Sequence, residues 1–185
     1  MVEQVKPIEI QDIFKVPIYK TELSLDTDEL EKVCHQYKDN NEGRIISNMG
    51  GYQSYDLPLN TLTIEPLIKE IEIHASNFAK YFINDNMQGT TNIWFNINSY
   101  KDFNQSHNHA HSEISGVYYV KAPEKSGNIT FEHPAKNVLS YYGYELKTSE
   151  WNNISSTEWN LKPYKNYLYL FPSWLNHFVS PNKNK

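Results

Sequence analysis

The stretch Tyr-Leu-Tyr-Leu-Phe at 167–171, which Pro172 ends, is an unbroken apolar and aromatic run typical of a buried β-strand. Three other stretches have strand-like composition: Thr91–Asn98, Ile114–Val120 and Gly127–Phe131. Gly, Pro and Asn residues punctuate these short stretches. Several short strands separated in this way predict a sandwich or barrel, so the expected fold class is mainly β.

Two amphipathic helix patterns occur in the first half of the chain. The first begins at Asp26 or Thr27, either of which can cap it, and acidic residues follow in its first turn. The second extends from about Leu62 to Phe82 with one apolar stripe, and Pro66 lies near its start, where a missing N–H costs little. We expect both helices to pack on one side of the β core.

The remaining parts of the first half are predicted to be an edge strand and a long loop. The stretch Ile8–Leu23 is apolar, but Pro17 within it suits an edge strand better than a central one. Asp39–Pro58 is polar and glycine-containing, and a loop of this length is uncommon without a role. The 185 residues therefore predict one domain, with residues 1–89 supporting a core formed by residues 90–185.

Charge and composition narrow the class of ligand. The net charge is −5, and Arg44 is the only arginine in the sequence, so no basic surface for a nucleic acid is expected. Cys34 is the only cysteine, which excludes a disulfide within the chain and is typical of a reducing compartment. No apolar run is long enough to cross a bilayer, and Met1–Gln11 lacks the apolar segment of a signal peptide. We expect a cytoplasmic protein without membrane partners.

The polar segment His107–Glu113 contains three histidines at intervals of two residues. In an extended segment, residues two apart point the same way, so His107 and His109 can present both imidazoles to one metal ion. The pairs His109 with His111 and His111 with Glu113 have the same spacing. His177 follows the buried strand and could return to the same cavity. Three imidazoles suit Fe(II), Zn(II), Cu(II) or Ni(II), and the spacing does not choose among them.

Further motifs occur in order between Gly50 and Asn182. They are Gly50–Ser54 (GGYQS), Trp94 with Asn96, the His-x-His of His107 and His109, Ser115–Tyr119 (SGVYY), Pro123, Ser126–Gly127, Phe131, Pro134, Leu170–Leu175 (LFPSWL), His177 and Pro181–Asn182. Together they resemble a family of 2-oxoglutarate- and Fe(II)-dependent oxygenases known from bacteria and their phages.

The resemblance implies a double-stranded β-helix (jelly-roll) core with two N-terminal helices, one Fe(II) at its open end and 2-oxoglutarate as cosubstrate. Carried over to matching positions, it implies that His107, His109 and His177 are the metal ligands. His109 stands where the wider superfamily has Asp or Glu, which makes the site more cationic. The resemblance also implies that Tyr119 supports 2-oxoglutarate and that Asn96 bonds its carboxylate or the substrate.

One expected residue is missing. The superfamily usually places an Arg or Lys about ten residues after the distal histidine, where it binds the far carboxylate of 2-oxoglutarate through charge-assisted hydrogen bonds. The sequence ends at Lys185, eight residues after His177, without an arginine there. We expect either a truncated sequence or a cosubstrate site that is lost or rebuilt, with Lys183 and Lys185 as candidate substitutes.

The predicted activity is that of a dioxygenase that hydroxylates an unreactive C–H bond of a small-molecule or peptide substrate. The aromatic segment Tyr141–Trp159 and the loop around Gly50 are candidate rim elements. Two alternatives keep the fold. A cupin-like metalloprotein would use His107, His109 and Glu113 without 2-oxoglutarate, although Trp174 stands where a cupin glycine is expected. A non-catalytic jelly-roll module would bind sugar or peptide on its aromatic faces. The sequence does not predict the oligomeric state.

Overall fold

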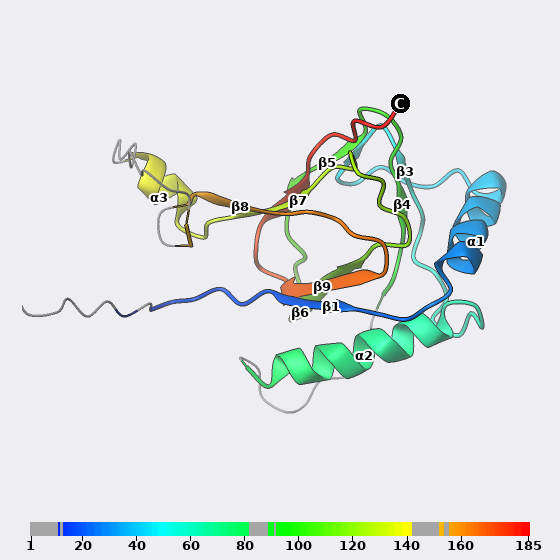
Figure 1. Ribbon diagram of the computed structural model, residues 1–185, viewed down its shortest axis with the longest axis horizontal. Coiled ribbons are helices and arrows are strands. Elements are labelled where there is room, and N and C mark those ends of the chain that lie inside the picture. The colour runs from blue at the N-terminus through cyan, green and yellow to red at the C-terminus, as the bar shows by residue number, and fades with distance from the viewer. Residues whose placement is uncertain (1–10, 12, 82–88, 91, 142–151, 154–155) are drawn as a thin grey trace, which may run out of the picture.

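The computed structural model describes residues 11, 13–81, 89–90, 92–141, 152–153 and 156–185. The strands in these residues form three antiparallel sheets, and the two larger sheets lie face to face (Figure 1). The three-stranded sheet has the order β1-β9-β6, with β1 at Tyr19–Glu22, β6 at Ile114–Tyr118 and β9 at Tyr167–Pro172. The five-stranded sheet has the order β2-β5-β10-β7-β8, with β2 at Asn48–Met49, β5 at Phe103–His107, β7 at Ile129–Glu132, β8 at Glu158–Leu161 and β10 at His177–Val179.

A third, two-stranded sheet pairs β3 (Tyr52–Gln53) with β4 (Asn96–Ile97). The turn that leads from β2 into β3 contains Gly50 and Gly51, both with positive φ angles of 71° and 50°. Residues with a Cβ rarely adopt this conformation, so glycine is required for this sharp turn. The predicted loop at Asp39–Pro58 thus contains two short strands that attach it to the β core.

Helix α2 (Glu65–Ala79) covers the outer face of the three-stranded sheet (Figure 1). Leu168 and Leu170 of β9 pack on this side, in one cluster with Leu67, Ile68 and Phe78 of the helix. The helix begins at Glu65 rather than near Leu62, because residues 62–64 form a turn and Pro66 occupies the first turn, where proline is tolerated. The predicted end at Phe82 lies outside the described residues.

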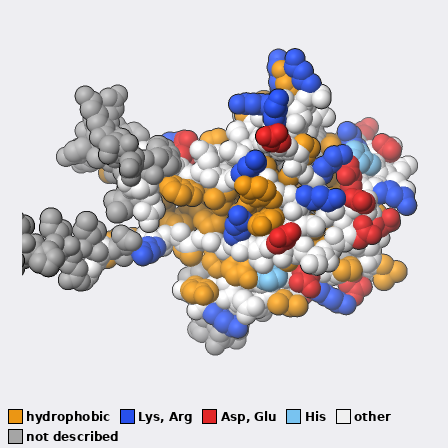
Figure 2. Space-filling model, viewed as in Figure 1, with side chains coloured by type: hydrophobic (Ala, Val, Ile, Leu, Met, Phe, Trp, Pro, Cys, Tyr) orange, Lys and Arg blue, Asp and Glu red, His pale blue; other side chains and the backbone are white. Residues whose placement is uncertain are grey.

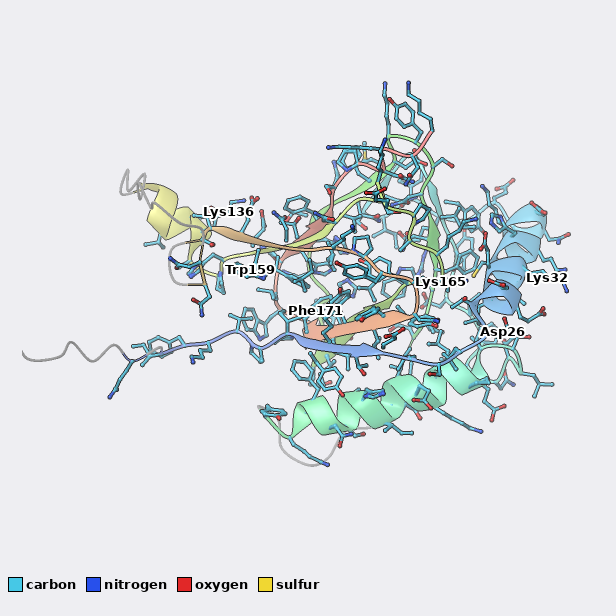
Figure 3. All side chains as sticks on the ribbon, viewed as in Figure 1. Asp26, Lys32, Lys136, Trp159, Lys165 and Phe171 are labelled. Atoms are coloured by element: carbon cyan, nitrogen blue, oxygen red, sulfur yellow. The ribbon has the colours of Figure 1, made fainter. Side chains whose placement is uncertain are left out.

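Helix α1 (Thr27–Asn40) begins where the sequence predicted. The Asp26 carboxylate accepts hydrogen bonds from the backbone N–H groups of Asp28 and Glu29, both at 3.1 Å. These bonds satisfy two of the donors that a helix start leaves free. Lys165 also donates to the Asp28 carboxylate at 2.9 Å. Figure 3 shows the Lys165 side chain near Asp26, at the N-terminal end of α1. The short helix α3 (Lys136–Tyr141) lies at the other end of the molecule.

A second apolar cluster lies between the two large sheets. Phe171 of β9 points away from α2 and packs against Ile129 and Phe131 of β7 (Figure 3). Figure 2 shows apolar side chains gathered between β8 and β9. Partly buried residues, among them Ile18 and Leu161, pack against the second cluster. Alternate residues of β9 therefore serve two cores, one under α2 and one inside the β structure.

The prediction of a mainly β fold with flanking helices is confirmed, and β1 lies at a sheet edge as expected. Strands β5, β8 and β10 were not predicted as strands. Among the described residues, no partner strand pairs with the second edge of β6 or of β4. No helix in the described part of the chain is long and apolar enough to cross a bilayer.

Candidate metal centre

Three histidines from two neighbouring strands meet at one end of the five-stranded sheet. His107 is the last residue of β5, and His177, the first of β10, lies directly opposite it in the antiparallel register. His109 follows two residues after His107. The ring centroids are 4.4 Å apart for His107 and His177, and 5.1 Å apart for each pair that includes His109. One ring nitrogen of each residue lies within 4.8 Å of the other two, so the three could hold one metal ion.

Backbone carbonyls orient two of these rings. The Nδ1 atom of His107 lies 2.7 Å from the carbonyl oxygen of Gln105, and Nδ1 of His177 lies 3.0 Å from that of Leu175. A carbonyl oxygen only accepts, so each Nδ1 carries the proton and each Nε2 keeps a free lone pair. The Nε2 atom of His109 is buried and has no hydrogen-bond partner among the described residues. Hydrogen bonds from Nδ1 to a backbone carbonyl, like those of His107 and His177, commonly fix the orientation of metal-binding histidines.

Burial keeps two of the three imidazoles, those of His109 and His177, uncharged. The His177 side chain is 5% exposed. Burial, with a smaller contribution from the neighbouring imidazoles, lowers its pKa to about 4, although the Leu175 carbonyl opposes this. Burial and the adjacent His107 also lower the pKa of His109 to about 4. Both rings are therefore neutral at pH 7, the form that binds a metal without first losing a proton.

Hydrogen bonds hold the loops that carry the histidines together. The His109 N–H donates to the carbonyl of Ser173 at 3.0 Å, and the Asn108 side chain donates to the Asn176 side chain at 2.9 Å. The hydroxyl groups of Ser173 and Ser115 are 2.7 Å apart and buried. These bonds connect the end of β5 to the β9–β10 turn and to β6. Sequence analysis missed these contacts, although Ser115 and Ser173 lie in the motifs SGVYY and LFPSWL.

Aromatic rings surround the imidazole cluster. Trp94 stacks on His109, with 5.4 Å between ring centroids and 29° between planes. Phe171 contacts His177 edge-on, with 4.7 Å between centroids, and Phe131 lies 6.2 Å from the same ring. This apolar wall limits the motion of the rings and explains the loss of hydration that lowers their pKa values.

The two predicted cosubstrate residues lie on other strands. Tyr119 follows β6 directly, and its hydroxyl is buried without a hydrogen-bond partner in the described parts of the chain. Burial, and secondarily Tyr169, raises its pKa, so the hydroxyl stays protonated and can donate. Asn96 begins β4, directly opposite Gln53 of β3, and is exposed.

The alternative ligands do not join the cluster. His111 and Glu113 are exposed, and His111 has a positive φ of 69°. The metal-binding group found among the described residues contains three histidines and no carboxylate. The arrangement of His107, His109 and Glu113 that a cupin would need is therefore not formed.

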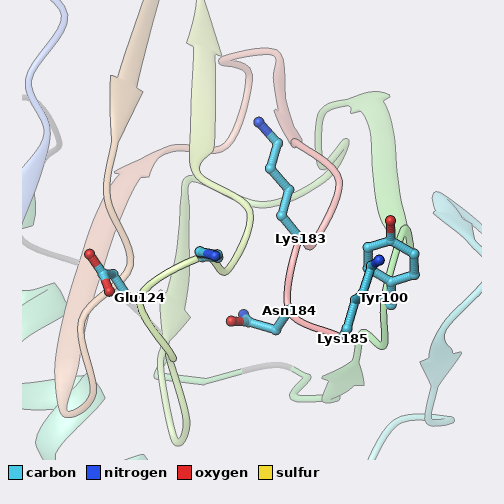
Figure 4. A pocket seen from close by; sticks show the side chains of 6 residues that line it. Tyr100, Glu124, Lys183, Asn184 and Lys185 are labelled. Atoms are coloured by element: carbon cyan, nitrogen blue, oxygen red, sulfur yellow. The ribbon is translucent and has the colours of Figure 1, made fainter.

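Lys183 and Lys185, the candidate substitutes for the missing arginine, line a surface pocket of about 850 Å³ (Figure 4). The other lining residues are Tyr100, Glu124, Lys125 and Asn184. None of the three histidines, Tyr119 or Asn96 lines this pocket. The two lysines therefore belong to a different place on the surface from the imidazole cluster.

The candidate rim segments are only partly described. Within Tyr141–Trp159, residues 142–151 and 154–155 lie outside the described residues. Trp159 in β8 is 40% exposed, and it lies between the two large sheets at the α3 end in Figure 3. The loop around Gly50 leads into β3, which pairs with the strand next to Trp94.

The fold and the three imidazoles together define a jelly-roll protein with a metal centre suited to Fe(II). The family described as "Putative 2OG-Fe(II) oxygenase" matches residues 92–185, and the chain belongs to this family. It is therefore an enzyme that uses Fe(II) and 2-oxoglutarate, as the sequence resemblance implied.

The solved structures confirm the predicted jelly-roll fold. A crystal structure of a Pseudomonas putida prolyl-4-hydroxylase is similar over 91% of this chain and 87% of its own, with a TM-score of 0.63 and 12% sequence identity. No curated protein matches the sequence significantly. At this identity the likeness concerns the fold alone.

Proposed function

We propose that this oxygenase is a hydroxylase whose iron is held by His107, His109 and His177. The observation that carries the proposal is the convergence of three imidazoles, two of which are bonded through Nδ1 so that Nε2 is available. Three protein ligands would leave other coordination positions of a bound Fe(II) open for small molecules. A small molecule or a peptide carrying the reacting C–H bond is the proposed substrate.

Bound Fe(II) and 2-oxoglutarate supply the oxidising chemistry: one oxygen atom of O2 enters the substrate, the other enters succinate, and CO2 is released. The protein's part is to bind and orient the substrate and to exclude water from the site. Phe171 and Trp94 restrict the imidazoles from two sides. The bond between Asn108 and Asn176 keeps the two histidine-bearing loops in register.

We assign Tyr119 and Asn96 to the small molecules that bind beside the metal. The Tyr119 hydroxyl is a buried donor without a partner in the described structure, and a carboxylate of 2-oxoglutarate is an acceptor that would satisfy it. Asn96 is exposed on β4 and offers both a donor and an acceptor to that carboxylate or to the substrate.

The test is anaerobic addition of Fe(II) and then 2-oxoglutarate, followed by visible absorption. A weak metal-to-ligand charge-transfer band is expected for the wild type, and succinate should form after oxygen is admitted. The variant His107→Ala should show neither. His35→Ala removes an exposed histidine of α1 and is the matched control, which should behave as wild type. Iron binding without the band would reject 2-oxoglutarate chelation at this site.

A further inference from the structure

A row of three polar residues crosses the small sheet beside the metal centre. The N–H of Arg44 donates to the carbonyl of Gln53 at 2.8 Å, and the two residues form an antiparallel bridge. Gln53 in turn lies directly opposite Asn96. Directly opposed residues of antiparallel strands point to the same face. Arg44, Gln53 and Asn96 therefore share one face.

Trp94 connects this polar row to the imidazole cluster. The Arg44 guanidinium lies 5.8 Å from the ring centre of Trp94, and the same ring stacks on His109. Tyr52, the neighbour of Gln53, points the other way and contacts Phe95. One aromatic ring thus contacts both a residue of the polar row and a proposed iron ligand.

Two buried atoms in this row lack partners. Nε of Arg44 is a donor and Oε1 of Gln53 is an acceptor, and neither makes a hydrogen bond to any described residue. Buried polar groups are nearly always paired, so an unpaired donor and an unpaired acceptor on two bridged residues indicate a ligand that presents the complementary groups.

The charge of Arg44 is already compensated. Its Nη2 atom forms an ion pair with the Asp56 carboxylate at 2.5 Å. An incoming carboxylate would meet the negative charge of Asp56 and the acceptor oxygen of Gln53. A neutral amide avoids this repulsion, because its C=O can accept from the Arg44 Nε–H while its N–H donates to Gln53.

We propose that Arg44 and Gln53 form a substrate subsite that binds an amide group, as in a peptide or an N-acylated small molecule, with Trp94 as its wall. The proposal rests on the proposed hydroxylase function and narrows its substrate class.

The single arginine makes the subsite directly observable. In the ¹⁵N-labelled full chain, the Arg44 Nε–H gives one NMR signal without arginine overlap. N-acetylglycine N′-methylamide should shift this signal saturably, whereas acetate and ethanol, a carboxylate and a hydroxyl probe, should not. Absence of a shift with the amide, or stronger binding of either comparison probe, would overturn the proposal.

Two comparisons test the contact to Gln53. Gln53→Leu should weaken amide binding by about tenfold, the effect of one hydrogen bond left unmade. Gln36→Leu, at an exposed glutamine of α1, should leave it unchanged. A simpler pair isolates the N–H: N-methylacetamide should bind the wild type, whereas methyl acetate, its ester counterpart without an N–H, should bind the wild type about as weakly as N-methylacetamide binds Gln53→Leu. Equal affinity of amide and ester would exclude the Gln53 contact even if the variant does not fold.

These measurements need neither iron nor 2-oxoglutarate. If the amide shifts the Arg44 signal but the charge-transfer band is absent, the subsite stands and the hydroxylase proposal fails. If the band and succinate appear without a shift, the hydroxylase proposal stands and the amide subsite is wrong.

Discussion

The two large sheets divide stability and chemistry between them. In the three-stranded sheet, β6 and β9 keep a regular register from Ile114 opposite Pro172 to Tyr118 opposite Leu168, and α2 covers its outer face. In the five-stranded sheet the strands are shorter, and the register between β10 and β5 shifts just after His177. The regular apolar sheet acts as a support, while the irregular one places the imidazoles.

This comparison indicates that contact with the regular three-stranded sheet orients the imidazoles of the five-stranded sheet. Phe171 belongs to the regular sheet but lies edge-on against His177 of the irregular one. Ser173, just beyond β9, accepts from the N–H of His109. The imidazoles therefore depend on β9 for position, while β9 depends on its contacts with α2 for stability.

The largest expected effect comes from the irregular sheet. His177→Ala should abolish iron-dependent succinate formation, because it removes one of the three proposed ligands. The circular dichroism spectrum should remain that of the wild type, since no residue of either apolar cluster is replaced. Retention of stoichiometric Fe(II) binding by this variant would contradict the ligand assignment.

A substitution in the regular three-stranded sheet should lower stability and leave activity nearly unchanged. Leu168→Ala removes a side chain that is 1% exposed and packed under α2. The free energy of unfolding should fall by about 2–5 kcal/mol, as for other buried leucines. Activity per folded molecule should stay near wild type, measured at a temperature where the variant is still folded. A loss of activity without a loss of stability would contradict the division between the sheets.

A smaller effect is expected on the stability of the metal-free chain when the pH is lowered. Burial lowers the pKa values of His109 and His177 to about 4 in the folded chain, against about 6.5 for an unperturbed histidine. The metal-free folded state therefore binds fewer protons than the unfolded state between these values. The stability from the two groups is complete above pH 6.5 and is lost as the pH falls toward 4.

Urea unfolding of the metal-free chain at pH 7, 5 and 4 measures this loss. Carboxylates elsewhere also titrate, so the comparison is with the double variant His109→Ala, His177→Ala. The double variant should lose less stability over the same interval. An identical pH profile for both proteins would show that the two imidazoles do not carry the effect.

The smallest effect concerns a helix start away from the metal centre. Asp26→Ala removes the side-chain cap of α1 and should lower the free energy of unfolding by about 1 kcal/mol. Asp26→Asn keeps an acceptor and should lose less. Succinate formation should be unchanged in both variants, and a change would show that α1 influences the metal centre.

The sequence was sufficient for the parts of the fold with strong local signals. Both helices, the edge strand and β9 follow from capping residues and apolar periodicity. The gathering of His107, His109 and His177 agrees with the spacing argument and with the motifs of the oxygenase family.

The missed strands have weak local signals. β5 has the sequence Phe-Asn-Gln-Ser-His and β10 only His-Phe-Val, so neither shows a long apolar alternation. They become strands because they pair with each other, and β10 also pairs with β7. Arg44 and Gln53, the residues of the proposed subsite, were missed for the same reason, since only the sheet register brings them together.

The direct opposition of His107 and His177 has a consequence for assembly of the active enzyme. Side chains alternate between the two faces of a strand, so a slip of β10 by one residue along β5 would turn the His177 ring to the wrong face. A misaligned molecule would then lack one of its proposed ligands and hold iron poorly. Incorrectly folded copies would remain inert toward oxygen rather than damage themselves, and the iron content of a preparation would measure its correctly aligned fraction.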